Sequence, residues 1–384
     1  MRDTILKAID SVSDELIELA KRIHATPEVG FKEVNAAQWL TETLGRHGFR
    51  VQRGVADLPT AFRAEASSAK PGPAVAFLAE YDALPEIGHA CGHNLICTAA
   101  LGAGIGLAAV ARQLPGKIVV LGTPAEEGGG GKVLMLARGA FAGVDAAMMF
   151  HPADYTVAAR PSLASYRLKV KFLGKAAHAA AAPFEGINAL DALIQMFVNI
   201  GLLRNQLRDD ARVHGIITYG GAAANIIPDR AEALFSVRAL DREYAAAVLE
   251  KVINCGRAGA TATGATLEHE VIKGYEAIRS NLHLATAFEH HLQELGWPIE
   301  SPTGKPRLGS TDMGDVSQKF PAIHPYLAIA KNIVGHTVEF REAACSELAF
   351  QAMLTAAKAM ALTGLDVLND SAFLEEVRVE FTSS

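Results

Sequence analysis

Apolar residues follow two different periods along this chain, and the change of period divides it into parts. In the first 160 residues, short and almost wholly apolar runs such as PAVAFLAEYD, KIVVLGTPA and VDAAMMFHP alternate with helix-like segments. Such runs are typical of strands that helices cover on both faces. The apolar stretch at residues 98–111 is shorter than the about 20 residues that span a bilayer, so it predicts a buried helix. Strand, helix and strand in this order indicate an α/β sheet.

Two further segments show helical spacing. Near the start, one face carries the apolar residues Ile5, Ile9, Val12, Leu16 and Leu19, which predicts a helix that ends before Pro27. After residue 280 the chain again shows apolar, helix-like segments, as in its first part. They include a predicted strand at YLAIA and a long predicted helix from Cys345 to about Leu362. These late elements complete the first sheet most simply if another domain interrupts it.

The interrupting segment has an alternating pattern. In SYRLKVKFLG, apolar residues alternate with Arg and Lys, which is typical of a strand in a sheet with one solvent-exposed face. A helix, two strands, a helix that Asp241 caps and a final strand follow. This β-α-β-β-α-β order is that of a ferredoxin-like unit. The predicted domains are therefore 1–163 and 277–384 as one α/β domain, with 164–276 inserted.

Composition narrows the class of protein. A length of 384 residues suggests two domains, and a formal net charge of -6 gives no basic surface for nucleic acid. The start of the chain does not resemble a signal peptide, and the four cysteines form no CxxC pair. We therefore expect a cytoplasmic protein with neither a nucleic-acid nor a membrane partner.

Ionisable residues gather where the apolar strands end. Cys91 and His93 lie two residues apart, so in extended chain both side chains project to the same side. A thiolate and an imidazole together suit zinc or another borderline divalent metal. A core cysteine beside a loop histidine, or a Cys-His nucleophile pair, would give the same pattern.

Adjacent carboxylates follow the second strand. Glu126 and Glu127 lie at its carboxyl end, where ligands bind in open α/β sheets. A divalent cation would relieve their repulsion. One glutamate would then bind metal while its neighbour takes a proton from water. A solvated loop that happens to carry two acids is the alternative.

Three other residues extend this group, and one stands apart. His151 ends the next apolar run, His336 comes from beyond the inserted domain, and Asp82 is placed to orient a ligand histidine. Together they favour a metal centre over isolated structural histidines. His178 lies in the inserted domain, where it would reach a substrate oxyanion only across a cleft.

Eight motifs in order carry a family resemblance over nearly the whole chain. They are AEYDALP, GHACGHN, PAEE, FHP, GKAAHAAAAPFEGINAL, the block from Gly220 to Arg238, GSTDMGDVS and GHTVEF. The sequence resembles the amidohydrolase branch of the aminoacylase and carboxypeptidase metallopeptidase superfamily. Within that branch it is similar to p-aminobenzoyl-glutamate hydrolase subunits and β-alanyl-lysine-type dipeptidases.

The resemblance implies a metal-dependent amidohydrolase that cleaves small N-acyl amino acids or dipeptides. It implies two divalent ions per subunit, Zn²⁺ or Mn²⁺, in a metallopeptidase-type domain with a central mixed sheet, and a lid domain that forms homodimers. Carried over by motif, Cys91 bridges the metals and Glu126 is the general base. The other implied ligands are His93, Glu127, His151 and His336. His178 would contact the reaction intermediate, and Asn225 would hold the substrate.

Three residues depart from the wider pattern. Better-known superfamily members carry a histidine ligand where this chain has Glu80 and an aspartate bridge where it has Cys91, and related sequences often carry Asp where it has Asn94. The change at Asn94 predicts a less firmly oriented His93. A catalytically silent subunit of a related hydrolase and a metal-storage protein are the remaining alternatives.

Overall fold

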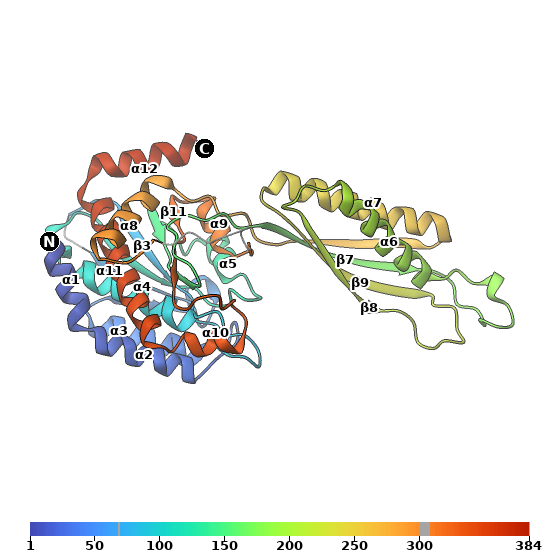
Figure 1. The fold of residues 1–384 in the computed structure, drawn as a ribbon, viewed down its shortest axis with the longest axis horizontal. Coiled ribbons are helices and arrows are strands. Elements are labelled where there is room, and N and C mark those ends of the chain that lie inside the picture. Colours follow the sequence, from blue (N-terminus) through green and yellow to red (C-terminus); the bar gives the residue numbers. More distant parts are fainter. Residues whose placement is uncertain (68–69, 300–307, 384) are drawn as a thin grey trace. The chain divides into compact units, whose positions relative to one another are not determined.

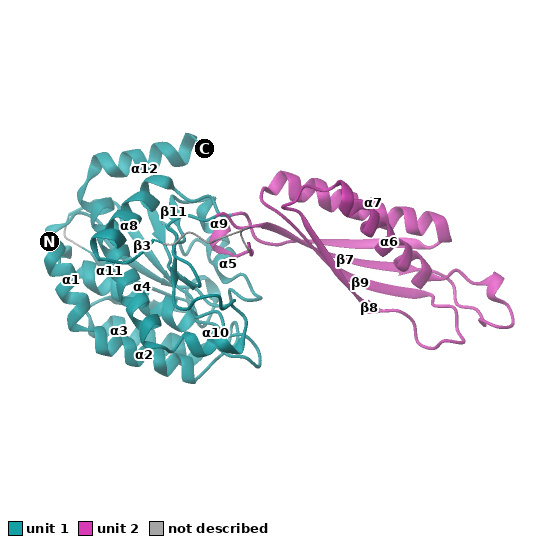
Figure 2. Cartoon of the chain, in the orientation of Figure 1, with its two compact units in different colours: residues 1–160, 278–307, 315–384 teal, residues 161–277, 308–314 magenta. Residues whose placement is uncertain are grey.

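The structure is a computed structural model, and it describes residues 1–67, 70–299 and 308–383. The chain divides into two compact units (Figure 2). Unit 1 comprises residues 1–160, 278–307 and 315–384, and unit 2 comprises residues 161–277 and 308–314. The α/β class with an inserted β-α-β-β-α-β domain, which the sequence predicts, is confirmed.

Unit 1 is built on a mixed sheet whose strands run in the order β1-β2-β4-β3-β5-β11. β3 pairs in parallel with β4 and β5, β5 in parallel with β11, and the β1-β2-β4 edge is antiparallel. A separate parallel pair joins β6 to β12. The strand bounds are β1 Arg50–Arg53, β2 Phe62–Ser67, β3 Ala74–Ala79, β4 Lys117–Gly122, β5 Ala146–Met148, β6 His151–Ala153, β11 Ala322–Ile323 and β12 Tyr326–Ala328.

Helices bury this sheet (Figure 1). α4 and α11 pack on each other and on β3, and every residue of α4 from His93 to Leu107 is buried. The helices with residues in this unit are α1 Arg2–Ser11, α2 Ser13–Ala25, α3 Val34–Arg46, α4 His93–Ala108, α5 Gly131–Ala137, α8 Leu282–Glu294, α9 Met313–Ser317, α10 Val338–Ala343, α11 Glu347–Asn369 and α12 Ser371–Ser383. In the described part of the chain, one helix, α11, passes a length and hydropathy test for a membrane span. Its apolar window is 67% buried, as expected of a core helix.

Unit 2 is an antiparallel sheet in the order β10-β7-β9-β8, with two helices. Its elements are β7 Ala164–Leu173, α6 Ala189–Leu203, β8 Arg212–Tyr219, β9 Arg230–Ala239, α7 Arg242–Thr263 and β10 Thr266–Lys273. Leu168, Val170 and Phe172 of β7 are buried in its core, as the alternating pattern predicts. The Asp241 side chain accepts a hydrogen bond from Tyr244 N, which confirms the predicted cap of α7.

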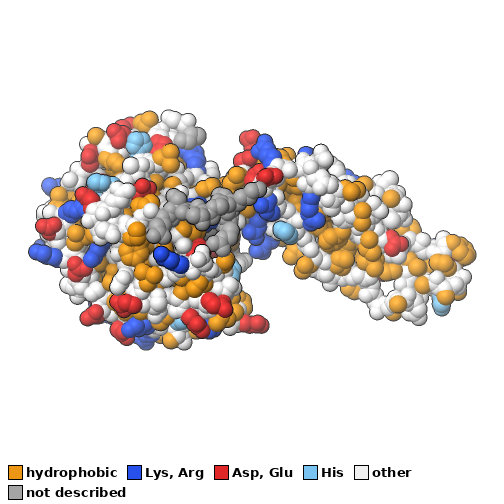
Figure 3. All heavy atoms as spheres, viewed as in Figure 1, with side chains coloured by type: hydrophobic (Ala, Val, Ile, Leu, Met, Phe, Trp, Pro, Cys, Tyr) orange, Lys and Arg blue, Asp and Glu red, His pale blue; other side chains and the backbone are white. Residues whose placement is uncertain are grey.

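Apolar side chains also remain exposed on unit 2, and many are visible in the space-filling view (Figure 3). Three of them, Ile194, Val198 and Leu202, repeat every four residues along α6 and are 47–65% exposed. Ile216 and Ile217 on the edge strand β8 are 63% and 47% exposed. An exposed apolar helical stripe and an unpaired strand edge are each typical of a surface that another protein covers.

Three predicted elements differ from the structure. The N-terminal helix is broken at Val12 into α1 and α2, because Val12 adopts φ -112° and ψ 7°. The run VDAAMMFHP is two short strands, β5 and β6, rather than one. The long C-terminal helix begins at Glu347 and continues to Asn369. Helical spacing and apolar runs indicate the kind of element, and neither carries a strong stop signal at these points.

Candidate metal centre

Three parallel strands bring the candidate residues to one edge of the sheet. β3 lies between β4 and β5, and all three are buried along most of their length. The segments that leave their carboxyl ends carry Glu80 and Asp82, then Glu126 and Glu127, then His151. Ligands bind at this edge in open α/β sheets. The adjacency of the three strands therefore gathers residues that are up to 71 positions apart in sequence.

Gly92 sets the turn that presents Cys91 and His93. It has φ +78°, and a Cβ at this position would lie 2.5 Å from Pro152 Cγ, so the close approach requires glycine. α4 begins directly after it, at His93. The turn places Cys91 Sγ 3.5 Å from His151 Nε2. The predicted thiolate and two imidazoles thus lie together.

Hydrogen bonds on the outer nitrogens orient both imidazoles. His93 Nδ1 lies 2.8 Å from the Asp82 carbonyl oxygen and 3.1 Å from Asp82 Oδ1, and His151 Nδ1 lies 2.7 Å from the Pro152 carbonyl oxygen. Because these oxygens only accept, each Nδ1 carries the proton, and each Nε2 is available toward the centre. A carboxylate or carbonyl in this position is the usual support of a metal-binding histidine.

The turn that carries the two glutamates is fixed by two buried acids. Asp82 Oδ2 accepts a hydrogen bond from Glu127 N at 2.9 Å, and Glu33 Oε1 accepts one from Ala125 N at 2.8 Å. Ala125 itself has φ +59°, a left-handed conformation that costs on the order of 1–3 kcal/mol outside glycine. The surrounding hydrogen bonds offset this strain and hold both carboxylates at the strand end.

His336 reaches the same place from the C-terminal part of unit 1. Its backbone also has a positive φ, +67°, and its N–H donates to the Ala90 carbonyl oxygen at 2.8 Å. Its Nε2 lies 3.3 Å from Glu127 Oε1. The strained backbone is held next to Cys91, which brings a residue from the far end of the sequence to the strand edge.

The donor atoms form three overlapping groups, each with all members within 4.8 Å of one another. The groups are Cys91 with His93 and His151, Cys91 with Glu127 and His336, and His93 with Glu126 and Glu127. The first two share only Cys91, so a bridging thiolate would serve two metal positions. Among the described residues, the buried His93 Nε2 and Glu127 Oε1 have ion-pair contacts at 3.3 Å, with Glu80 Oε1 and His336 Nε2, but no hydrogen bond of good geometry, and a metal ion would satisfy both.

The electrostatic surroundings of His93 and Cys91 favour a bound metal cation. Burial lowers the pKa of His93, but the neighbouring Glu80, Cys91 and Asp82 together outweigh burial and raise that pKa well above its usual value. Surroundings that attract a proton to Nε2 attract a metal ion equally. Burial raises the pKa of the Cys91 thiol far above its usual value, which argues against a free thiolate nucleophile. Coordination by zinc would deprotonate it.

A buried ion pair borders the centre, and no motif in the sequence indicates it. Lys132, at the start of α5, lies 2.6 Å from Glu80 Oε2, and both side chains are at most 1% exposed. Glu80 Oε1 lies 3.3 Å from His93 Nε2. The sequence shows only a lysine inside the apolar segment GKVLML. Glu33 is likewise absent from the predicted site, because its contacts with Thr60 and Ala125 are distant in sequence.

Comparison with known proteins agrees with this geometry. Residues 159–259 match the family model of the peptidase dimerisation domain, M20_dimer. Over 388 residues the chain is 41% identical to a mouse Xaa-Arg dipeptidase, covering 97% of this chain and 90% of the relative. The chain belongs to the M20 metallopeptidase family.

Other members of this family agree in sequence and in fold. The chain is 30% identical to a p-aminobenzoyl-glutamate hydrolase subunit from Escherichia coli, over 97% of this chain and 93% of the relative. A dinuclear metal-binding M20 peptidase from Bacillus subtilis superposes with a TM-score of 0.73 at 21% identity, over 94% and 100% of the two chains. The family resemblance that the sequence indicates is confirmed, and this M20 chain is a metal-dependent hydrolase.

The two candidates from the inserted domain of this M20 protein lie together within unit 2. Ala179 N, directly after His178, donates to the Asn225 carbonyl oxygen at 3.1 Å. His178 Nδ1 accepts hydrogen bonds from Ala180 N and Ala181 N, both at 3.2 Å. The proton is therefore on Nε2, and this exposed ring presents an N–H donor. His178 lies in the segment between β7 and α6.

The expectation about Asn94 is wrong. Its amide Nδ2 donates to the carbonyl oxygens of Ala344 at 3.0 Å and Ala20 at 3.5 Å, and neither bond involves His93. Asp82 supports that ring instead. The amide at position 94 joins α4 to the backbone of two other helical regions, a task that an unprotonated aspartate, which has no donor, would not perform.

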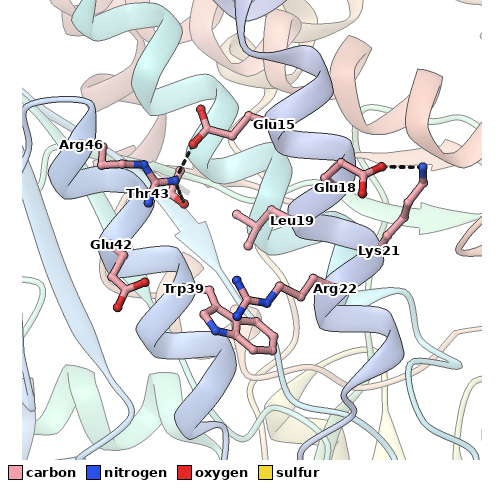
Figure 4. A pocket seen from close by; sticks show the side chains of 9 residues that line it. All are labelled: Glu15, Glu18, Leu19, Lys21, Arg22, Trp39, Glu42, Thr43 and Arg46. Carbon is pink, nitrogen blue, oxygen red and sulfur yellow. Dashed lines mark hydrogen bonds and ion pairs between the residues drawn. The ribbon is translucent and has the colours of Figure 1, made fainter.

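A surface hollow on another part of unit 1 has different chemistry. It lies between α2 and α3, and its lining residues include Trp39, Arg22, Glu15 and Arg46 (Figure 4). Arg22 stacks on Trp39 at 3.8 Å, and Arg46 lies 2.6 Å from Glu15. Arg46 and Glu15 thus form an ion pair within the hollow, and none of the metal candidates lines it.

Proposed function

We propose that this M20 hydrolase cleaves the amide bond of dipeptides or small N-acyl amino acids with a pair of zinc or manganese ions. The observation that carries the proposal is the two donor groups that share Cys91, with the Glu126 carboxylate beside them. Cys91 would bridge the pair. The further ligands would be His93, Glu127, His151 and His336. When bound, the metals would polarise the substrate carbonyl and lower the pKa of water.

The protein side chains would carry the proton through the reaction. Glu126 lies beside the metal ligands without being needed as one, so it is the proposed general base. It would take a proton from water as the oxygen attacks the carbonyl carbon. It would then deliver that proton to the amine nitrogen as the C–N bond breaks. The products are a free carboxylate and a free amine.

The inserted domain would bind the substrate. His178 Nε2–H is a donor suited to the oxyanion that develops on the carbonyl oxygen, and Asn225 would hold the substrate nearby. The dimerisation-domain match and the exposed stripe on α6 support a homodimer through unit 2. We propose that the enzyme acts in the cytoplasm.

Amine release from a panel of substrates tests the proposal. The panel includes Xaa-Arg dipeptides, β-alanyl-lysine, aminobenzoyl-glutamate and N-acetyl amino acids, and the protein is reconstituted with Zn²⁺ or Mn²⁺. We expect release that a chelator abolishes and fresh metal restores. Two bound metals by elemental analysis without release from any substrate would overturn the proposal and favour a catalytically silent subunit. Release that survives chelation would overturn the metal mechanism.

A further inference from the structure

One tyrosine of unit 1 joins the metal centre to two residues that the proposed reaction leaves unused. Tyr326 begins β12 and is the register partner of His151 in the parallel β6-β12 pair. The two rings lie 5.3 Å apart, centroid to centroid. Because strand pairing fixes this separation, the groups that contact Tyr326 stand at a defined distance from a candidate metal ligand.

Arg160 is the first of these groups. Its guanidinium carbon lies 4.6 Å from the ring centroid of Tyr155 and 5.3 Å from that of Tyr326, and the two rings are 5.7 Å apart. Stacking on aromatic rings occupies the face of a guanidinium and leaves its N–H groups in the plane. A cation held in this way is suited to the two oxygens of a carboxylate.

His324 is the second group. It is only 2% exposed, and its Nδ1 lies 3.2 Å from the Tyr326 hydroxyl. Its Nε2 is buried without a hydrogen-bond partner among the described residues. Native proteins rarely leave such a nitrogen unpaired. Its ring is 5.5 Å from that of His151, so the unpaired nitrogen lies close to the metal centre.

Charged residues of both signs lie near His151. Glu126 and Glu127 lie with His93 in one donor group, and the Arg160 guanidinium lies 5.3 Å from the Tyr326 ring, which is itself 5.3 Å from the His151 ring. In a dipeptide or an N-acyl amino acid, the free carboxylate is three bonds from the scissile carbonyl carbon. We propose that Arg160 and His324 form a subsite for this carboxylate, so that a free acid is selected over a neutral amide. This inference rests on the proposed function and names the substrate group that the site would recognise.

Pairs of substrates that differ only in this group test the subsite. The best substrate from the panel is compared with its C-terminal amide, using kcat/KM for the metal-loaded wild type, Arg160→Gln and His324→Leu. We expect each variant to lose on the order of 10- to 100-fold on the free acid, chiefly through KM, and to change little on the amide. Arg22→Gln is the matched control, because Arg22 also stacks on an aromatic ring, Trp39, and should leave both substrates unaffected.

Equal losses on acid and amide would overturn the subsite, since they would mean that Arg160 and His324 are only structural. Tyr326→Phe separates the two groups: it keeps the ring under Arg160 and removes the bond to His324. If the wild type hydrolyses no substrate, the proposed function fails, and the subsite is tested by calorimetric binding of N-acetylarginine and its amide. Tighter binding of the acid that Arg160→Gln removes would support the subsite, and equal affinities would refute it.

Discussion

Replacing Lys132 by methionine tests whether the pair between Lys132 and Glu80 stabilises unit 1. The Nζ–Oε2 distance is 2.6 Å and the side chains are 0% and 1% exposed. At an effective dielectric constant of about 20, Coulomb's law gives roughly 6 kcal/mol for unit charges at this separation. Removing one partner of a buried pair costs about 3–5 kcal/mol, because the other charge stays buried. We therefore expect Lys132→Met to lower the free energy of unfolding by about 3–5 kcal/mol.

Denaturant unfolding of the chelated protein measures this loss. The chain has two tryptophans, Trp39 and Trp297, and both lie in unit 1, so their fluorescence reports the unfolding of that unit. Lys21→Met is the matched control. Its Nζ–Oε1 distance to Glu18 is 2.7 Å, but the side chains are 46% and 72% exposed, so solvent screens this pair and we expect little change in the free energy of unfolding.

A second variant identifies the origin of the loss. In Lys132→Met with Glu80→Gln, the carboxylate that the single variant leaves without its lysine is neutral, so the double variant should be more stable than the single one. If Lys132→Met costs no more than Lys21→Met, the reasoning is refuted. If the double variant is as unstable as the single one, packing rather than charge explains the cost.

Three further predictions address the reaction and its pH dependence. Glu126→Gln should keep its metal content by elemental analysis while kcat falls on the order of 10²- to 10⁴-fold; an active variant would contradict the proposed base. His178→Ala should lower kcat on the order of 10²- to 10³-fold with metal retained, and mixing it with Glu126→Gln should restore activity if each site uses both subunits. Burial raises the pKa of Glu33 from 4.5 to about 7, so the native state holds the extra proton between these values, and stability should fall by about 3 kcal/mol as pH rises through them. Urea unfolding from pH 5 to 8 should show this fall in the wild type and not in Glu33→Gln.

The sequence predicts the gathering of Cys91, Glu126 and His151 because they follow buried strands. Parallel strands end at one edge, so strand-end position alone places such residues near one another. The order β4-β3-β5 is not contained in any single run, since it depends on pairing between segments far apart in the chain. The sequence also groups His336 with these residues, although its own segment follows no apolar strand, and the family resemblance implies that it is a ligand.

Residues that act through non-local contacts were harder to predict. Lys132 follows four glycines and begins a short helix, where a lysine is normally exposed, and only the fold shows that it is completely buried. His324 lies in the sequence IHP, which is similar to the FHP that contains His151. His324 and His151 follow β11 and β5, which pair in parallel, so the similarity reflects neighbouring strands. Pairing across more than 170 residues produces this neighbourhood and leaves no local pattern.

The formal charges at the centre favour two metal ions over one. Four carboxylates border His93: Glu80 and Glu127 through Nε2, Asp82 through Nδ1, and Glu126 in the same donor group. The Cys91 thiolate would add a fifth negative charge, and Lys132 supplies one buried positive charge. Two divalent ions would bring the formal total to zero, whereas one would leave two uncompensated negative charges in a buried site, which is costly. Lys132 is therefore needed for a neutral centre. Without it, the formal charge would remain negative with both metals bound, and a third cation or a proton would be needed to neutralise it.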